Sequence, residues 1–197
     1  MGWKTDLRTR LDQNEPREIA VDFPEAGILV PITDSDNPEI ILTQRAPHLK
    51  THRGQVAFPG GKRDEDDEDL RATALRESEE EIALKPGSVE LFGRLSQVIS
   101  RHEIVVTPYV GVVPEGVELE ANPAEIDSVF RVPVDFFLED KRLRTDKLSF
   151  MNFSLYVPCW EWQGYHVWGM SAVVLVDLLN VGFGANIDLR QPPIAEE

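Results

Sequence analysis

The chain has 197 residues, of which 42% are hydrophobic, and it carries a formal net charge of −15. This length is enough for one domain with a substantial core, and the acidic surface would repel nucleic acid and anionic membranes, so neither is an expected partner. We expect a single domain over residues 1–197, with an N-terminal extension over 1–20 and a loose tail over 190–197.

Two further features indicate a cytoplasmic protein. The first residues of the chain are polar and charged, unlike a signal peptide, and no stretch of 18 apolar residues could form a transmembrane helix. Cys159 is the only cysteine, which excludes an intrachain disulfide and fits a reducing compartment.

Apolar spacing and turn residues predict three strands and two helices in the first half of the chain. A basic, turn-rich loop over residues 45–54 separates the second strand from the third, and a turn at Gly60 and Gly61 closes the third. The predicted elements are a helix over 3–11, strands over 26–31, 39–44 and 55–58, and a helix over 69–84.

The second half of the chain continues with strands and two helices. Residues 101–103 are predicted to form the turn between two strands, and Pro158 with Cys159 the turn of a hairpin. The predicted elements are strands over 89–100, 104–113 and 129–132, a helix over 133–138, hairpin strands over 148–157 and 161–167, and a helix over 168–179. Strands flanked by helices in this way predict an α/β sandwich with a mixed sheet.

The helix predicted over residues 69–84 carries a patch of carboxylates. Glu77, Glu80 and Glu81 are three and four positions apart, so they share one helix face. Three carboxylates held so close repel one another unless a cation neutralises them, and hard cations such as Mg²⁺ and Mn²⁺ prefer oxygen ligands. The acidic run over 64–69, taken alone, is explained equally well as the solvated start of a helix.

Residues 61–84 resemble a Nudix box, the loop–helix signature of hydrolases that cleave nucleoside diphosphates linked to another group. The family pattern is Gly, five residues, Glu, seven residues, then Arg-Glu-apolar-x-Glu-Glu-x-Gly-apolar. Six residues rather than five separate Gly61 from Glu68, Ser78 replaces an apolar residue, and Ala83 replaces the second glycine. The matching residues are Glu68, Arg76, Glu77, Glu80, Glu81 and Leu84.

Residues 41–61 resemble a second signature, that of the coenzyme A pyrophosphatases. Its pattern is Leu-Leu-Thr-x-Arg-Ser/Ala, three residues, Arg, three residues, Gly, three residues, Phe-Pro-Gly-Gly. The matching residues are Leu42, Thr43, Arg45, Ala46, Gly54, Phe58, Pro59, Gly60 and Gly61, with Ile41 and Lys50 as near-matches. The resemblance implies a Nudix-type α/β/α sandwich with a mixed β-sheet. It also implies Mg²⁺- or Mn²⁺-dependent hydrolysis of coenzyme A or acyl-coenzyme A to 3′,5′-ADP and (acyl-)4′-phosphopantetheine.

The same resemblance implies roles for individual residues. Arg76 would orient the carboxylates through a charge-assisted pair, and Glu68 would hold the loop or contact a metal-bound water. Glu77 is the first candidate for the general base; Glu125, in a later loop, is the second, and it is also explained as an exposed loop residue. The implied metal ligands are Glu77, Glu80, Glu81 and the carbonyl oxygen of Gly60.

Positive charge upstream of the box would bind the phosphates of the substrate. The candidates are Arg45, Lys50 and Arg53, together with Gly61, whose missing side chain permits a close approach of the backbone. Arg45 is also explained by a structural ion pair on its strand. His102, at a predicted turn, is either a substrate contact or a surface histidine.

Two alternatives to the coenzyme A reaction stay open. The first is a Nudix pyrophosphatase that acts on ADP-ribose, NADH or another nucleoside diphosphate derivative. The second, from a different class, is a non-catalytic ligand sensor with a Nudix fold, against which the complete Arg-Glu-x-x-Glu-Glu sequence argues. The expected partner is a small-molecule nucleotide, and a homodimer is a candidate assembly.

Overall fold

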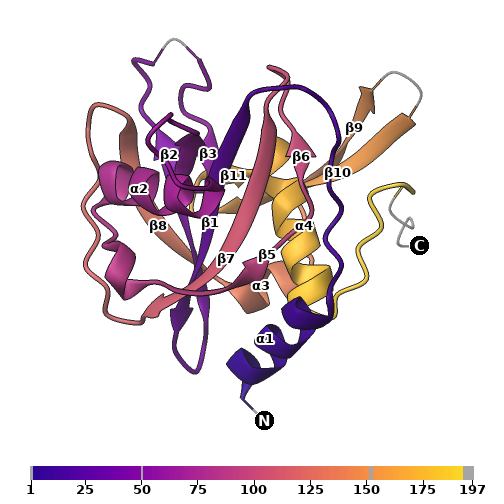
Figure 1. Ribbon diagram of the computed structural model, residues 1–197. Helices are drawn as coiled ribbons and strands as arrows, with labels where there is room; N and C mark the ends of the chain where they lie inside the picture. The colour runs from indigo at the N-terminus through magenta and orange to yellow at the C-terminus, as the bar shows by residue number, and fades with distance from the viewer. Residues whose placement is uncertain (1, 50, 151–152, 193–197) are drawn as a thin grey trace.

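A mixed β-sheet forms the centre of the molecule (Figure 1). The computed structural model describes residues 2–49, 51–150 and 153–192. Strand β1 (Glu25–Asp34) pairs in parallel with β7 (Val105–Pro114) and antiparallel with β2 (Glu39–Arg45) and β4 (Gly60–Lys62). The sheet is completed by β3 (Val56–Ala57), β5 (Glu90–Arg94), β6 (Val98–Ile99) and β8 (Ile126–Pro133).

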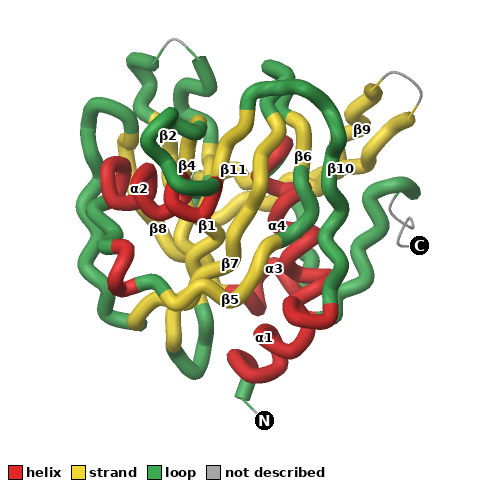
Figure 2. Tube along the Cα trace, viewed as in Figure 1, coloured by secondary structure: helices red, strands yellow, loops and turns green. Residues whose placement is uncertain are grey.

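Helices cover both faces of this sheet, as Figure 2 shows. On one face, α2 (Leu70–Ile82) packs its Ala74 and Ile82 against Leu29 of β1 and Ile41 of β2. On the other face, α1 (Trp3–Gln13) and α4 (Gly169–Phe183) share a core with the alternate residues of β1 and β2. Because successive strand residues point to opposite faces, both cores are filled from the same strands. The α/β sandwich expected from the sequence is confirmed, and no helix among the described residues could cross a bilayer.

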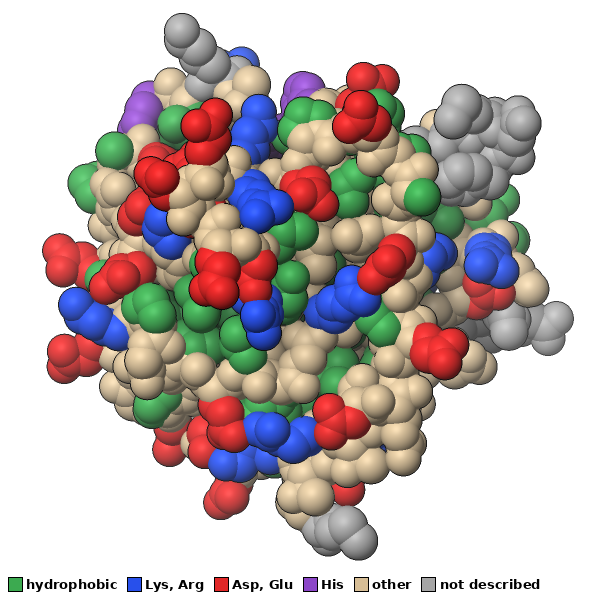
Figure 3. All heavy atoms as spheres, viewed as in Figure 1, with side chains coloured by type: hydrophobic (Ala, Val, Ile, Leu, Met, Phe, Trp, Pro, Cys, Tyr) green, Lys and Arg blue, Asp and Glu red, His purple; other side chains and the backbone are tan. Residues whose placement is uncertain are grey.

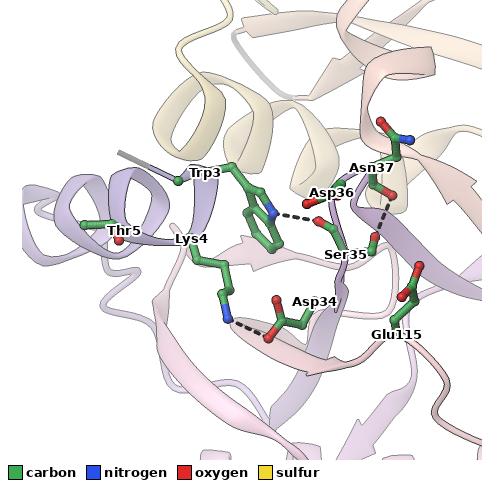
Figure 4. Close-up of a pocket in the computed structure, with 9 residues that line it drawn as sticks. Trp3, Lys4, Thr5, Asp34, Ser35, Asp36, Asn37 and Glu115 are labelled. Atoms are coloured by element: carbon green, nitrogen blue, oxygen red, sulfur yellow. Dashed lines mark hydrogen bonds and ion pairs between the residues drawn. The ribbon is translucent and has the colours of Figure 1, made fainter.

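Helix α1 is fixed to the turn between β1 and β2. The indole Nε1 of Trp3 donates to the carbonyl oxygen of Ser35 at 2.8 Å, and Lys4 Nζ lies 2.5 Å from Asp34 Oδ2 (Figure 4). The Trp3 ring also stacks on Phe183 of α4, with ring centroids 6.5 Å apart. A polar cavity of about 640 Å³ lies beside these contacts. The N-terminal helix is therefore part of the packed structure.

The strand predicted over residues 89–100 is interrupted. Leu95 donates its N–H to the carbonyl oxygen of Pro108 in β7, but a proline has no N–H to return. The next two N–H groups leave the ladder: Ser96 donates to Asp177 Oδ2 at 2.8 Å, and Gln97 donates to the carbonyl oxygen of Arg17 at 2.9 Å. One predicted strand therefore becomes the two short strands β5 and β6.

The hairpin predicted around Pro158 and Cys159 is wrong. Both residues lie inside β10 (Phe153–Trp162), which pairs with β9 (Arg144–Phe150) and β11 (Tyr165–Val167). The chain turns instead at Gln163 and Gly164, whose φ angles of 51° and 88° are those of a tight left-handed turn. Of the tail predicted over 190–197, residues 193–197 lie outside the described part of the chain. The short helix α3 (Val134–Leu138) and the 3₁₀ turn η1 (Pro86–Ser88) are the remaining elements.

Candidate active site

Helix α2 is fixed at both ends, which sets the direction of its carboxylates. At its start, Asp69 Oδ1 accepts from the N–H groups of Arg71 and Ala72 at 2.8 and 2.9 Å, as an N-cap does. At its end, the loop before β8 covers the free carbonyl groups, with Asn122 N–H donating to the Glu81 carbonyl oxygen at 2.8 Å. The helix ends at Ala83, whose left-handed φ of 56° turns the chain away from the helix axis.

Glu81 is the most buried carboxylate of this helix, with 2% of its surface exposed. Its Oε2 accepts from the backbone N–H of Gly60 at 3.1 Å, and its Oε1 lies 3.3 Å from Nη1 of Arg45. Burial raises the pKa of Glu81 to about 7, against the opposing effects of these two partners. A cation beside Glu81 would compensate for the cost of keeping its charge buried.

Two glycines make room for the carboxylates. A Cβ atom at position 61 would collide with the carboxyl group of Glu77, so Gly61 allows that group to lie directly over the backbone of β4. Gly60 has a φ of 144°, and a Cβ there would lie 2.5 Å from the carbonyl oxygen of Gly27. Burial also raises the pKa of Glu77, which Arg76 partly counteracts. In the described geometry, the space at Gly61 is filled by Glu77.

Arg76 is held by an acid that the sequence analysis missed. Its Nε and Nη2 donate to the two carboxylate oxygens of Asp67, each at 2.9 Å, and this pair holds the pKa of Asp67 well below its usual range. The third nitrogen, Nη1, reaches Glu77 at 3.1 Å and Glu80 at 3.3 Å. Arg76 therefore bridges the loop to the carboxylate face.

Glu68, the residue aligned with the box glutamate, is exposed, and its carbonyl oxygen accepts from Arg63 Nη2 at 3.1 Å. The extra residue after Gly61 creates two registers. Counting back from Arg76 leads to Glu68, whereas counting forward from Gly61 leads to Asp67. The forward count was the signal that could have found Asp67.

Glu125 is near enough to Glu77 and Glu81 to affect both carboxylates electrostatically. Burial is the main reason why the pKa values of Glu77 and Glu81 are raised, and the negative charge of Glu125 adds to the effect on both. Its carbonyl oxygen accepts from the N–H of Ala46 at 2.8 Å, so the loop before β8 and the loop after β2 meet here. Three carboxylates, from α2 and from this loop, thus act on one another.

The basic residues predicted to bind substrate have separate positions. The guanidinium of Arg45 contacts Glu81, which agrees with the structural ion pair left open by the sequence, and its Nε is buried without a hydrogen bond among the described residues. Arg53 is exposed in the loop after β2. Lys50 lies outside the described residues. His102 is exposed in the turn between β6 and β7.

The donor set at this site fits a hard divalent cation, because it offers carboxylate oxygens in a partly buried setting. Glu77 and Glu81 face the Gly60–Gly61 backbone, whereas Glu80 is 56% exposed at its side chain and is turned to Arg76. Within residues 2–49, 51–150 and 153–192, no three His, Cys, Asp or Glu side chains are already gathered as a ligand set. A cation bound by Glu77 and Glu81 would be completed by a further ligand, for which Glu80, Glu125 and the carbonyl oxygen of Gly60 are candidates.

Comparison with known proteins identifies relatives over most of the chain. The family profile of the NUDIX domain matches residues 24–152. The uncharacterized Nudix hydrolase NudL of Yersinia enterocolitica serotype O:8 is 35% identical over 170 residues, which cover 85% of this chain and 86% of the relative. The protein of the same name from Klebsiella pneumoniae strain 342 is 38% identical over 176 residues, covering 89% and 92%. Among solved structures, a NUDIX hydrolase from Alicyclobacillus acidocaldarius aligns with a TM-score of 0.49 at 20% identity, over 61% of this chain and 83% of that one.

Proposed function

The chain belongs to the Nudix hydrolase family and is a hydrolase of phosphoric anhydrides. From this premise we propose that it cleaves coenzyme A or acyl-coenzyme A. The proposed products are 3′,5′-ADP and (acyl-)4′-phosphopantetheine. Nudix hydrolases generally need divalent metal ions, and the proposed ion here is Mg²⁺ or Mn²⁺, because the available donors are oxygens.

One observation carries the coenzyme A proposal: the segment with the coenzyme A signature closes directly on the carboxylate helix. Arg45, near the start of this segment, contacts one oxygen of Glu81, and Gly60, near its end, donates to the other. The loop between them is thus tied to the reaction site at both ends. A signature in this position is suited to selecting the substrate, which the carboxylates alone do not do.

The proposed reaction is attack of water on one phosphorus of the pyrophosphate. A bound cation supplies charge neutralisation and an activated water. Glu77 accepts a proton from the attacking water as the new O–P bond forms. The bond between the attacked phosphorus and the bridging oxygen breaks, and that oxygen leaves on the other phosphoryl group with the negative charge. Arg76 keeps Glu77 in place, while Gly60 and Arg45 do the same for Glu81. The proposed ligands are Glu77, Glu80, Glu81 and the carbonyl oxygen of Gly60.

Glu125 is the second candidate for the base, and its electrostatic effect on Glu77 and Glu81 favours its inclusion. The two candidates are separated by a pair of variants. If Glu77 is the base or an essential ligand, Glu77→Gln is nearly inactive and Glu125→Gln loses little. The opposite order would assign the proton transfer to Glu125.

The proposal is tested with a substrate panel. Coenzyme A, an acyl-coenzyme A, ADP-ribose and NADH are compared at equal concentration with Mg²⁺ or Mn²⁺, and again with excess chelator. We expect coenzyme A or its thioester to have the highest kcat/KM, and all activity to disappear with the chelator. A preference for ADP-ribose or NADH would favour the first alternative substrate class. Ligand binding without any hydrolysis would favour the sensor.

A further inference from the structure

Two exposed arginines, one in the loop after β2 and one in the turn between β6 and β7, have no acidic partner among the described residues. In a chain with 35 acidic and 20 basic residues, positions 40–63 contain no Asp or Glu. Arg53 from this segment and Arg101 from the turn between β6 and β7 are exposed, and neither takes part in an ion pair among the described residues. Most other arginines of the described chain do have such a pair. The unpaired charge is therefore available to an anion from solution.

A histidine contact joins the two segments that carry these cations. The rings of His52, in the loop after β2, and His102, in the turn between β6 and β7, meet edge to face with centroids 5.0 Å apart. His52 is held by Gln55, whose Oε1 lies 2.8 Å from His52 Nδ1. On the other side, Ser100 Oγ accepts from the N–H groups of His102 and Ile104. Figure 1 shows both segments at the upper end of the molecule, and Figure 3 shows histidines along that same edge.

A short chain of hydrogen bonds connects this histidine pair to the carboxylates. Gln55 holds His52 through its side chain, and its backbone carbonyl oxygen accepts from the backbone N–H of Arg45 at 2.9 Å. Arg45 in turn contacts Glu81 through its guanidinium at 3.3 Å. The loop after β2 therefore begins and ends beside the reaction site, and His52 and His102 lie just beyond it.

We propose that His52, Arg53, Arg101 and His102, here called the basic rim, bind a phosphomonoester of the nucleotide substrate that is separate from the pyrophosphate being cleaved. This inference rests on the proposed function, since coenzyme A carries such a group as its 3′-phosphate. Guanidinium groups bind phosphate through paired N–H donors. A neutral imidazole has one N–H, which His102 can donate to the phosphate, whereas His52 uses its Nδ1–H on Gln55 Oε1 and donates from Nε2 when protonated. Arg45 is assigned to Glu81 instead. Selectivity then depends on the turn between β6 and β7, which lies outside both sequence signatures.

The first test is binding, measured by calorimetry on the full-length protein with Mg²⁺. The ligands are 3′,5′-ADP, 5′-AMP and inorganic phosphate, and the variants are Arg101→Ala, His102→Ala and His52→Asn. Asparagine is chosen at position 52 because His52 has a φ of 54°, which asparagine tolerates. Arg190→Ala, at an exposed arginine near the end of the described chain, is the control.

We expect the rim variants to weaken binding of 3′,5′-ADP by about ten- to a hundredfold, the range for loss of charge-assisted hydrogen bonds, and to leave 5′-AMP binding unchanged. Arg190→Ala should change neither. Equal weakening for both nucleotides, or none for either, would overturn the proposal. Inorganic phosphate that competes with 3′,5′-ADP but not with 5′-AMP would support it, and competition with both equally would count against it.

The second test separates this inference from the proposed substrate. Hydrolysis is compared for coenzyme A against dephospho-coenzyme A and for NADPH against NADH, since each pair differs by one phosphomonoester. His102→Ala should reduce kcat/KM only for the member that carries the extra phosphate. If the protein prefers NADPH to coenzyme A, the coenzyme A assignment fails but the basic rim is still supported. If His102→Ala lowers both members of each pair alike, the rim fails whichever substrate is preferred.

Discussion

At the scale of single residues, the burial of Glu81 decides much of the chemistry. This carboxylate is nearly inaccessible, yet among the described residues its partners are one backbone N–H and one guanidinium nitrogen. Charge in such a setting is costly unless a cation neutralises it. In the proposed mechanism, the same residue therefore links metal binding, catalysis and the stability of the folded chain.

The first prediction concerns activity. Glu81→Gln keeps the size of the side chain but removes its charge, so kcat should fall by on the order of 10²–10³, the effect of losing one transition-state stabiliser. Glu79→Gln is the matched control, since Glu79 lies on the same helix, is exposed, and within the described part of the chain pairs with Lys85 alone, at 3.6 Å. Steady-state kinetics with saturating Mn²⁺ provide the measurement. A near-normal kcat in the Glu81→Gln variant would show that Glu81 takes no part in the reaction.

The second prediction concerns pH and stability in the metal-free protein. The pKa of Glu81 is about 7 when folded, against 4.5 as its ordinary value, so the folded state binds the proton more tightly than the unfolded state. Stability from this group is thus complete below about pH 4.5 and is lost as pH rises through 7, by on the order of 2–3 kcal/mol. Melting temperature in excess chelator should fall between pH 5 and pH 8, and less steeply in Glu81→Gln. An unchanged slope in that variant would contradict the assignment.

The third prediction concerns the acid that holds Arg76. Asp67→Asn removes two charge-assisted hydrogen bonds and should cost about 1–2 kcal/mol at pH 7. Because the folded pKa of Asp67 is lowered, the difference from the unchanged protein should shrink as pH falls below the ordinary value of 3.8. The neighbouring Glu68→Gln should be nearly neutral, since Glu68 is exposed. Urea unfolding of both variants measures the contrast, and equal losses would place Glu68 in the role given to Asp67.

At the scale of elements, the end of α2 shows what a substitution in the family pattern costs. Ala83 stands where the pattern has glycine, and it adopts a left-handed φ of 56° that strains a side chain with a Cβ. The helix ends there all the same, because the Glu81 and Ile82 carbonyl groups are bonded by the loop before β8. The fold tolerates the alanine rather than prefers it.

Ala83→Gly should therefore stabilise the protein. Relief of the left-handed strain is offset in part by the greater freedom of glycine in the unfolded chain, which leaves a gain of about 0.5–1 kcal/mol. Ala72→Gly, inside the same helix, should instead cost about 1 kcal/mol. Chemical denaturation of the two variants provides the comparison. A loss of stability in Ala83→Gly would mean that the alanine side chain makes a contact worth more than the strain.

The elements that the sequence could predict are those with local signals. The periodicity of α2, its N-cap and its carboxylate face all follow from residues a few positions apart, and the turn between β1 and β2 follows from its Asp, Ser, Asn and Pro content. The hairpin around Pro158 failed because proline can also lie inside a strand, as it does in β10. The true turn signal, Gln163 followed by glycine, was weaker than the usual Asn-Gly.

The same distinction between local and long-range signals applies to the residues of the candidate site. Spacing alone placed Glu77 and Glu81 on one face of α2, but it did not show that Glu80 is exposed and turned to Arg76. The contact of Arg45 with Glu81 spans 36 positions, and that of His52 with His102 depends on two loops meeting. Such contacts are set by sheet topology and packing, which no local pattern encodes.

At the scale of the whole molecule, charge is unevenly distributed. Residues 64–81 contain ten carboxylates and two arginines, so this segment alone has a net charge of −8 out of −15. Self-repulsion of this kind lowers the stability of the compact state, and salt screens it over a Debye length of about 10 Å at 0.1 M. Six of the ten carboxylates are exposed and screened by any salt, whereas the half-buried Glu77 and the buried Glu81 are screened poorly.

The two kinds of charge predict different responses to two salts. NaCl should raise the melting temperature modestly by general screening. MgCl₂ at the same ionic strength should raise it further, because an ion that binds only the folded state adds stability in proportion to RT ln(1 + [L]/Kd). The extra increment should disappear in Glu77→Gln, which removes one proposed ligand, and persist in Glu79→Gln, which removes only an exposed charge. Differential scanning calorimetry at matched ionic strength measures it. If MgCl₂ and NaCl stabilised the unchanged protein equally, the carboxylates of α2 would be an acidic surface rather than a metal site.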